Sequence, residues 1–269
     1  MHAIIGYLIA DLLVRVLPAR WPENLATWIA RRAFSLRVPA RRILDGNLAR
    51  VRPGLSAPAR TRIARRSFEQ FALSLVEFLR LRGSAPPALA GHIEVRGRHH
   101  LETARAAGRG VILLSAHVGN WEWGAAYLAA GGPRIHVVAR AHPNAWVERF
   151  FRLRRESGGV STLPGGSVWT RAALALRRGE WVAVMGDRPA PGSHRPLCAW
   201  AAGLARRTGA VLLPAVMLRT GPGRYAACFE APLSPAECAG GGYRGSMMRY
   251  VRRYPSQWQA FEKLPMGWM

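Results

Sequence analysis

The residues that could do chemistry begin with a histidine and a glutamate five positions apart, His117 and Glu122. His117 follows an apolar segment, Val111–Leu114, that predicts a strand buried on both faces. Asn120 is a favourable helix N-cap, and it places Glu122 in the first turn of a predicted helix over 121–130, where the helix dipole favours a carboxylate. On one continuous helix, positions five apart point about 140° apart, but a strand–turn–helix lets the two side chains meet.

This pair indicates general base catalysis. A carboxylate that accepts a proton from one imidazole nitrogen fixes the tautomer and leaves the other nitrogen to take a proton from a substrate near neutral pH. The alternative is that His117 is satisfied within a turn and Glu122 is only a helix-terminal charge, since a spacing motif is a hypothesis until its context supports it.

The elements that must position this pair alternate between strands and helices from about residue 92. The hydrophobic pattern predicts strands near 92–96, 111–115, 134–139, 160–163, 181–185, 211–217 and 224–229, and helices near 98–107, 121–130, 143–157, 167–178, 199–208 and 243–254. Such an order predicts an α/β fold with a mostly parallel central sheet flanked by helices. Ligand sites in these sheets lie at the carboxyl ends of strands, where His117, Arg140 and the pair Asp187–Arg188 fall.

The N-terminal part has a different pattern, which predicts helices over 1–17, 21–34, 41–49 and 62–81. The segment Gly83–Pro87 is the clearest boundary in the chain. We therefore divide the sequence into a helical N-terminal region over 1–87 and an α/β domain over 88–269.

The first predicted helix, Met1–Leu17, is apolar apart from His2, Asp11 and Arg15. Asp11 and Arg15 are spaced as an i,i+4 ion pair. The segment is shorter than the roughly 20 residues of a membrane span and lacks the basic start of a signal peptide. We expect a helix that lies in the membrane interface, with a core helix as the alternative.

The composition is strongly basic. The 269 residues contain 39 basic and 15 acidic side chains, a net charge of +24, and Lys263 is the one lysine. Residues 1–90 alone hold fifteen arginines and five acidic residues. Such a surface suits anionic lipid, an acidic carrier protein or nucleic acid. The three cysteines and eight histidines lack disulfide or metal-ligand spacing, so we expect a reduced compartment and neither metal nor cofactor.

The segment from Gly108 through His117 to Glu122 resembles the H-x-x-x-x-(D/E) block of the lysophospholipid acyltransferase superfamily, and specifically the bacterial lipid A biosynthesis (lauroyl/myristoyl) acyltransferases. Further blocks are similar in the same order. They are Val137–Arg140 with Pro143–Asn144, Arg154 ahead of Gly158, Val182–Asp187, Leu204–Pro214 and Tyr254–Trp258. The resemblance covers most of the chain.

The resemblance implies transfer of an acyl chain from an acyl-carrier-protein or coenzyme A thioester to a hydroxyl of a membrane lipid. It implies that His117 deprotonates the acceptor and that Glu122 orients His117. The implied substrate-binding residues are Arg140 and Arg154, which would bind phosphate, Asp187, and Gly119 and Asn120, whose backbone amides could support the oxyanion. No covalent nucleophile is needed, since a thioester is already activated.

The acceptor implied by this branch is a lipid A-type glycolipid precursor, and the expected location is the cytoplasmic face of the cell inner membrane, at an anionic surface. The stretch Asp187–Trp200 is shorter than its counterpart in the family. Another hydroxylated lipid, such as a phosphatidylinositol mannoside or a glycerolipid, is therefore the alternative acceptor. A non-catalytic basic protein of membranes or nucleic acid is the rival from another class, although we expect no nucleic-acid partner.

Overall fold

The computed structural model describes residues 2–18, 20–36, 38–81, 93–163, 167–188 and 197–264. Within them lie four N-terminal helices, α1 (His2–Val16), α2 (Arg20–Ser35), α3 (Pro39–Val51) and α4 (Ala57–Arg80). The predicted boundary at Gly83–Pro87 lies outside the described residues, as does most of the shortened stretch after Asp187.

The rest of the described chain alternates strands and helices as predicted. The strands are β1 (Ile93–Arg96), β2 (Val111–Ser115), β3 (Ile135–Val138), β4 (Val160–Leu163), β5 (Trp181–Met185), β6 (Val211–Gly221) and β7 (Arg224–Phe229). The helices are α5 (Arg98–Ala106), α6 (Trp121–Ala130), α7 (Ala145–Ser157), α8 (Val168–Arg177), α9 (Leu197–Thr208), α10 (Pro235–Ala239) and α11 (Gly242–Arg253), with a 3₁₀ turn η2 at Pro255–Gln257. The pattern did not predict α10 and η2, and β6 is longer than expected.

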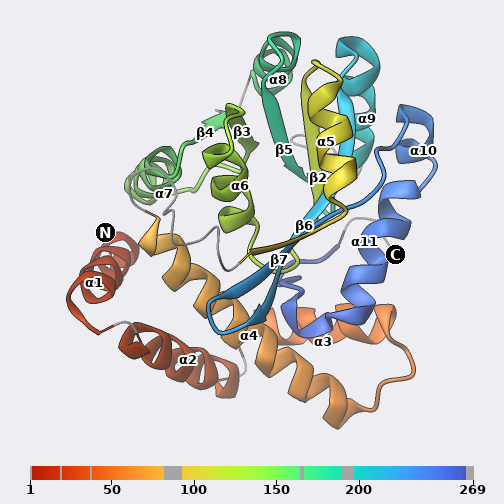
Figure 1. Ribbon diagram of the computed structural model, residues 1–269. Helices are drawn as coiled ribbons and strands as arrows, with labels where there is room; N and C mark the ends of the chain where they lie inside the picture. Colours follow the sequence, from red (N-terminus) through yellow and green to blue (C-terminus); the bar gives the residue numbers. More distant parts are fainter. Residues whose placement is uncertain are drawn as a thin grey trace.

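The strands form a seven-stranded sheet in the order β1-β7-β6-β2-β5-β3-β4, in which the β6–β7 hairpin alone is antiparallel among the described pairs. The mostly parallel α/β sheet is thus confirmed. Figure 1 shows the sheet with helices on both sides and α1–α4 gathered at one end.

Both faces of the sheet are apolar, because alternate residues of β2 enter two different cores. Ile112 and Leu114 pack with α8, α9 and α11, and with residues of α2–α4. Val111 and Leu113 pack on the other face, against α5 and α6. All four are at most 4% exposed, so each contributes about 1.5–3 kcal/mol of burial free energy, and the rigid strand ends directly before His117.

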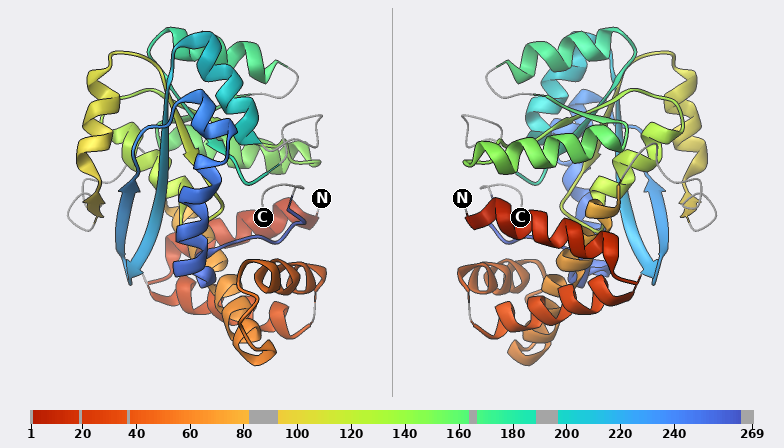
Figure 2. Two further views of the ribbon diagram at one scale, coloured as in Figure 1. Left: turned by 90° about the vertical axis from the view of Figure 1, so that its right-hand side faces the viewer. Right: turned by 90° about the vertical axis from the view of Figure 1, so that its left-hand side faces the viewer.

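The N-terminal helices lie against the end of the sheet where the parallel strands finish. Figure 2 shows α1 and α2 crossing this end, with α4 running beneath the sheet. Tyr7 of α1 stacks on Phe150 of α7 and meets Phe151 edge to face, and Phe78 of α4 stacks on Phe151. These contacts hold α1, α4 and α7 together.

Candidate active site

The centre of the site is a hydrogen-bonded pair formed by His117 and Asp187. Imidazole Nδ1 lies 2.8 Å from Asp187 Oδ1, and the His117 backbone N–H donates to Asp187 Oδ2 at 3.0 Å. Asp187 is fully buried, whereas the His117 side chain is 20% exposed. A carboxylate only accepts, so Nδ1 carries the hydrogen and Nε2 keeps the lone pair that a general base needs.

The sheet register brings these two residues together. Parallel strands β2 and β5 are neighbours, and Ser115 pairs with Met185. His117 and Asp187 each stand two residues beyond that pair, so both emerge from the same edge of the sheet at the same height. Burial alone would raise the pKa of the Asp187 carboxyl, but the electrostatic attraction of His117 and Arg188 and the two hydrogen bonds from His117 outweigh burial and hold the pKa below its ordinary value.

Glu122 does not occupy the position we expected. Its carboxylate accepts a bidentate interaction from the Arg155 guanidinium of α7, with Nη2–Oε1 at 2.7 Å and Nε–Oε2 at 3.0 Å, while Asp187 is at His117 Nδ1. The expected contact between Glu122 and His117 is therefore wrong. Glu122 joins the first turn of α6 to α7, and the acid that contacts the imidazole comes from the neighbouring strand instead.

Asp187 was expected to contact substrate, and the geometry corrects that assignment. The side chain is 0% exposed, and both carboxylate oxygens receive hydrogen bonds from His117. Asp187 thus acts on the imidazole, and its carboxylate is not accessible to a substrate.

The amides of Gly119 and Asn120 are also committed elsewhere. The Gly119 N–H donates to Gln257 O at 2.9 Å, and the Asn120 N–H donates to Met217 O at 2.8 Å. The expected oxyanion support from these two amides is therefore wrong, because each donor is already satisfied. Gly119 has φ +72°, and an added Cβ would lie 1.9 Å from Met217 O, so glycine is required here for close approach of the turn to β6.

Gln259, in the segment after η2, also hydrogen-bonds to the turn that carries His117. Gln259 N donates to His117 O at 2.8 Å, and Gln259 Nε2 donates to Gly119 O at 2.9 Å. Gln259 is 2% exposed. These contacts fix the backbone from His117 to Gly119. The sequence predicted no role for Gln259, since a glutamine near the chain end carries no local signal of its partner.

A buried glutamate of α4 supports the turn through Asn120. Glu77 accepts from Asn120 Nδ2 at 2.6 Å, from the Arg219 guanidinium, and from the Tyr225 hydroxyl. Asn120 Oδ1 in turn accepts from Trp123 N at 3.2 Å, which caps α6 as predicted. Glu77 is 6% exposed, and its charge is compensated by Arg219. The sequence offered no sign of this network, because Glu77 looks like one charge on an amphipathic helix.

The two arginines expected to bind phosphate differ in their surroundings. Arg140 follows β3 with a side chain 71% exposed, and it lies 3.5 Å from Glu262. Arg154 is 9% exposed, pairs with Asp11 of α1, and donates to Leu81 O. The expected phosphate contact of Arg154 is wrong in this geometry, because its guanidinium is buried between α1 and α4. The i,i+4 pair of Asp11 and Arg15 is confirmed.

Arg154 therefore predicts a stability effect. Replacing Arg154 by Met leaves Asp11 buried with less compensation, and we expect the free energy of unfolding in urea to fall by about 3 kcal/mol. Arg152→Met is the matched control on the same helix, because the Arg152–Glu156 pair is exposed, at 44% and 41%, and is worth less than about 1 kcal/mol. Equal small losses for both variants, with a raised KM for Arg154→Met, would instead restore Arg154 as a phosphate ligand.

A partly exposed imidazole held by a buried carboxylate at the carboxyl edge of a mostly parallel sheet is typical of α/β enzymes in which histidine acts as a general base. Within this class, the chain belongs to the bacterial lipid A biosynthesis acyltransferase family, whose profile matches residues 3–240. The resemblance seen in the sequence is thereby confirmed, and the chain is an acyltransferase of this family.

Curated relatives carry a more specific name. The phosphatidylinositol mannoside acyltransferase of Mycolicibacterium smegmatis (strain ATCC 700084 / mc(2)155) is 29% identical over 240 residues, which cover 87% of this chain and 74% of the relative. A protein of the same name from Mycobacterium tuberculosis (strain CDC 1551 / Oshkosh) is 31% identical over 187 residues, 64% of this chain and 59% of the relative. Family membership favours the enzyme over the rival non-catalytic protein.

Proposed function

We propose that the protein transfers an acyl chain from a carrier-protein or coenzyme A thioester to a hydroxyl of a phosphate-bearing glycolipid. The observation that carries this proposal is the His117–Asp187 pair. The names of the relatives support an acceptor of the phosphatidylinositol mannoside type. A lipid A precursor, the acceptor we inferred from the sequence, is the second candidate, and the family's name supports it.

The reaction needs one base and no covalent intermediate on the protein. His117 Nε2 takes the proton of the acceptor hydroxyl as its oxygen attacks the thioester carbonyl. The resulting tetrahedral oxyanion collapses, the carbon–sulfur bond breaks, and the imidazolium returns the proton to the thiolate, so that an ester and a free thiol leave. Asp187 stabilises the transient imidazolium and keeps Nε2 toward the substrate.

The oxyanion then needs donors other than the Gly119 and Asn120 amides. We propose the first-turn amides of α6, from Trp121 and Glu122, since the first N–H groups of a helix have no partner within it and the dipole there favours negative charge. Trp121 is beside the base, with its ring centroid 4.8 Å from that of His117.

A pair of arginines beside the site suits the phosphate of the acceptor. Arg140 and Arg188 lie 3.5 and 3.6 Å from opposite oxygens of Glu262, distances too long for strong hydrogen bonds. Glu262 is 52% exposed, so a substrate phosphate can displace it with little loss. We propose that Glu262 holds the two guanidinium groups until the acceptor binds.

This anchoring predicts opposite effects on KM. Arg140→Ala should raise the KM for the lipid acceptor about tenfold with little change in kcat, because phosphate binds in ground and transition states alike. Glu262→Gln should lower the KM, because it removes the competing carboxylate. Arg134→Ala is the matched control, with a side chain 70% exposed and 3.5 Å from Glu180, ahead of β3 rather than after it. A stability change alone in Arg140→Ala would contradict the anchoring role.

We also propose that α1 and α2 hold the enzyme on the inner membrane, at its cytoplasmic face. None of the helices in the described part of the chain has the length and apolar character to span a bilayer. Apolar side chains instead face outward at helical spacing. They are Ile5, Leu8, Ile9, Leu12 and Val16 on α1, and Trp21, Leu25, Trp28 and Ile29 on α2, each 37–65% exposed. Such exposed apolar faces are typical of interfacial helices.

Membrane binding should have a salt-resistant part. Attraction of arginines to anionic lipid is screened by salt, whereas burial of apolar side chains is not. High salt should release the protein from anionic vesicles only partly, and it should release a clearly larger fraction of the variant Leu8→Ser/Ile9→Ser/Leu12→Ser in a flotation assay, since that variant keeps only the apolar face of α2. Leu174→Ser, which changes an exposed leucine of α8, should behave as the unmodified chain does. Full release of the unmodified protein by salt alone would contradict this proposal.

The proposed reaction is tested by mass spectrometry of lipids incubated with the purified protein. We expect one acyl chain to be added to phosphatidylinositol mannoside when acyl-CoA or acyl-carrier protein is supplied. Addition to a lipid A precursor instead would favour the second candidate. No product from either lipid, with both donors supplied, would contradict the proposed function.

A further inference from the structure

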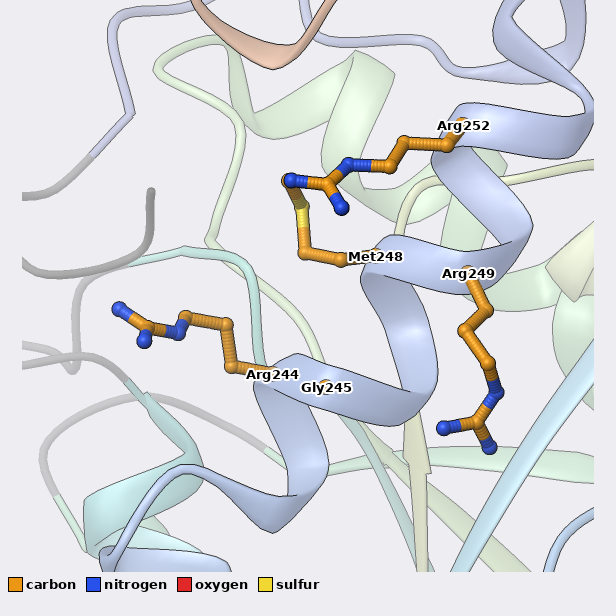
Figure 3. Close-up of a pocket in the computed structure, with 5 residues that line it drawn as sticks. All are labelled: Arg244, Gly245, Met248, Arg249 and Arg252. Carbon is orange, nitrogen blue, oxygen red and sulfur yellow. The ribbon is translucent and has the colours of Figure 1, made fainter.

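The outward face of α11 carries an arginine-lined hollow of about 270 Å³. Its lining is Arg244, Gly245, Met248, Arg249 and Arg252. Arg244, Met248 and Arg252 are spaced four residues apart, and Figure 3 shows their side chains extending to the same side of the helix. Arg249 extends the other way, where it donates to Glu230 at 2.6 Å. Two arginines and a thioether thus face the same space.

Gly245 keeps this hollow open. A glycine inside a helix costs roughly 0.5–1 kcal/mol relative to alanine. A Cβ added at Gly245 would meet nothing within 4 Å, so packing does not require glycine here. The absence of a side chain leaves room between the two arginines and above Met248.

The helix that carries the hollow also contacts the two strands of the catalytic pair. Tyr243, the residue before Arg244, is buried, and its hydroxyl donates to Ser115 O at 2.6 Å. A Cβ at Gly186 would lie 2.6 Å from Tyr243 Cζ. Ser115 lies two residues before His117, and Gly186 directly precedes Asp187, so the first turn of α11 packs against the strand ends that carry the pair. From Arg244 to Arg252 the helix then advances about 12 Å, at 1.5 Å per residue.

This arrangement matches the chemistry of one donor. A coenzyme A thioester has its reactive carbonyl at one end of a long pantetheine arm and an adenosine with a 3′-phosphate and a diphosphate at the other. Guanidinium groups bind phosphate through charge-assisted hydrogen bonds, and a methionine suits the apolar face of a purine. A hollow of this volume is near the small-molecule scale of about 300 Å³, whereas a carrier protein needs about 800 Å² of matching surface.

We infer that the hollow on α11 binds the phosphate-bearing nucleotide end of an acyl-CoA donor. This inference rests on the proposed function, because it assigns that function one of its two donors. The pantetheine arm then runs from the hollow toward His117, which places the thioester carbonyl at the catalytic pair.

The experiment measures binding of coenzyme A itself by isothermal titration calorimetry, together with the KM for acyl-CoA. Arg244→Gln/Arg252→Gln should weaken binding about tenfold or more and raise the KM in proportion, with kcat little changed. Arg206→Gln/Arg207→Gln is the matched control, because it removes the same charge from the exposed last turn of α9, and should change binding less than about twofold. Gly245→Leu, which fills the hollow without altering charge, should also weaken binding.

Unchanged binding of coenzyme A in both hollow variants would overturn the inference while leaving acyl transfer by His117 intact. So would an unmodified protein that transfers from acyl-carrier protein and binds no coenzyme A. A protein that binds coenzyme A in a manner sensitive to Arg244 and Arg252, yet acylates none of the lipids, would support the hollow and count against the proposed function instead.

Discussion

His117→Ala is expected to reduce kcat for acyl transfer by about 10²–10⁴-fold, which is the range that a positioned general base contributes. The imidazole is the group whose Nε2 can accept the proton of the acceptor hydroxyl, because Nδ1 is engaged by Asp187 at 2.8 Å. The variant should fold normally, since the side chain lies at the site surface with 20% exposure and its backbone contacts to Asp187 and Gln259 remain possible.

The measurement is product formation from a thioester and the lipid acceptor, with circular dichroism and urea unfolding as controls for the fold. Retention of more than about a tenth of the unmodified rate would remove His117 from the role of base. Binding of either substrate should be little affected, since the imidazole acts mainly on the reacting hydroxyl.

Asp187→Asn is expected to have an effect almost as large, about 10²–10³-fold in kcat, with little change in KM. The amide that replaces the carboxylate cannot stabilise an imidazolium. If the NH₂ group of the Asn faces Nδ1, the hydrogen of the imidazole is forced onto Nε2, and Nε2 can no longer act as the base.

The same substitution has an effect on the pH dependence of stability. The pKa of Asp187 lies below its ordinary value, so the carboxylate stays ionised above that pKa. Its contribution to the free energy of unfolding is lost only as pH falls through the lowered folded value. The Asn variant should lack this acid-dependent loss.

Glu122→Gln is the comparison that separates the two carboxylates. Glu122 pairs with Arg155 and both side chains are about 15% exposed, so its neutral amide should lower stability and change kcat much less than Asp187→Asn does. The reverse order, with Glu122→Gln the more damaging to kcat, would return Glu122 to the position beside the imidazole that its spacing suggested.

Much of the molecule could be predicted because the relevant signals are local. Short apolar runs placed the described strands, and the period of 3.6 residues placed the long helices, within a few residues, since both signals are properties of each segment itself. Asn120 was predicted as the cap of α6 for the same reason. The placing of His117, Arg140 and Asp187 at strand ends followed from the alternation of strands and helices.

The sequence by itself determined the α/β fold, the candidate base His117 and the family to which the chain belongs. Only the tertiary structure decided which carboxylate hydrogen-bonds to the His117 imidazole. The sheet order places β5 beside β2, so Asp187, seventy residues away in sequence, lies closer to the imidazole than Glu122, five residues away. Strand order depends on the packing of all the crossover helices at once, and no local pattern contains it.

The same reason explains why the substrate contacts expected for Arg154, Gly119 and Asn120 were wrong. Their chemistry is visible in the sequence, but their partners, Asp11, Gln257 and Met217, come from distant elements that satisfy each donor on folding. A buried polar group must find a partner, and the fold alone determines which one it finds.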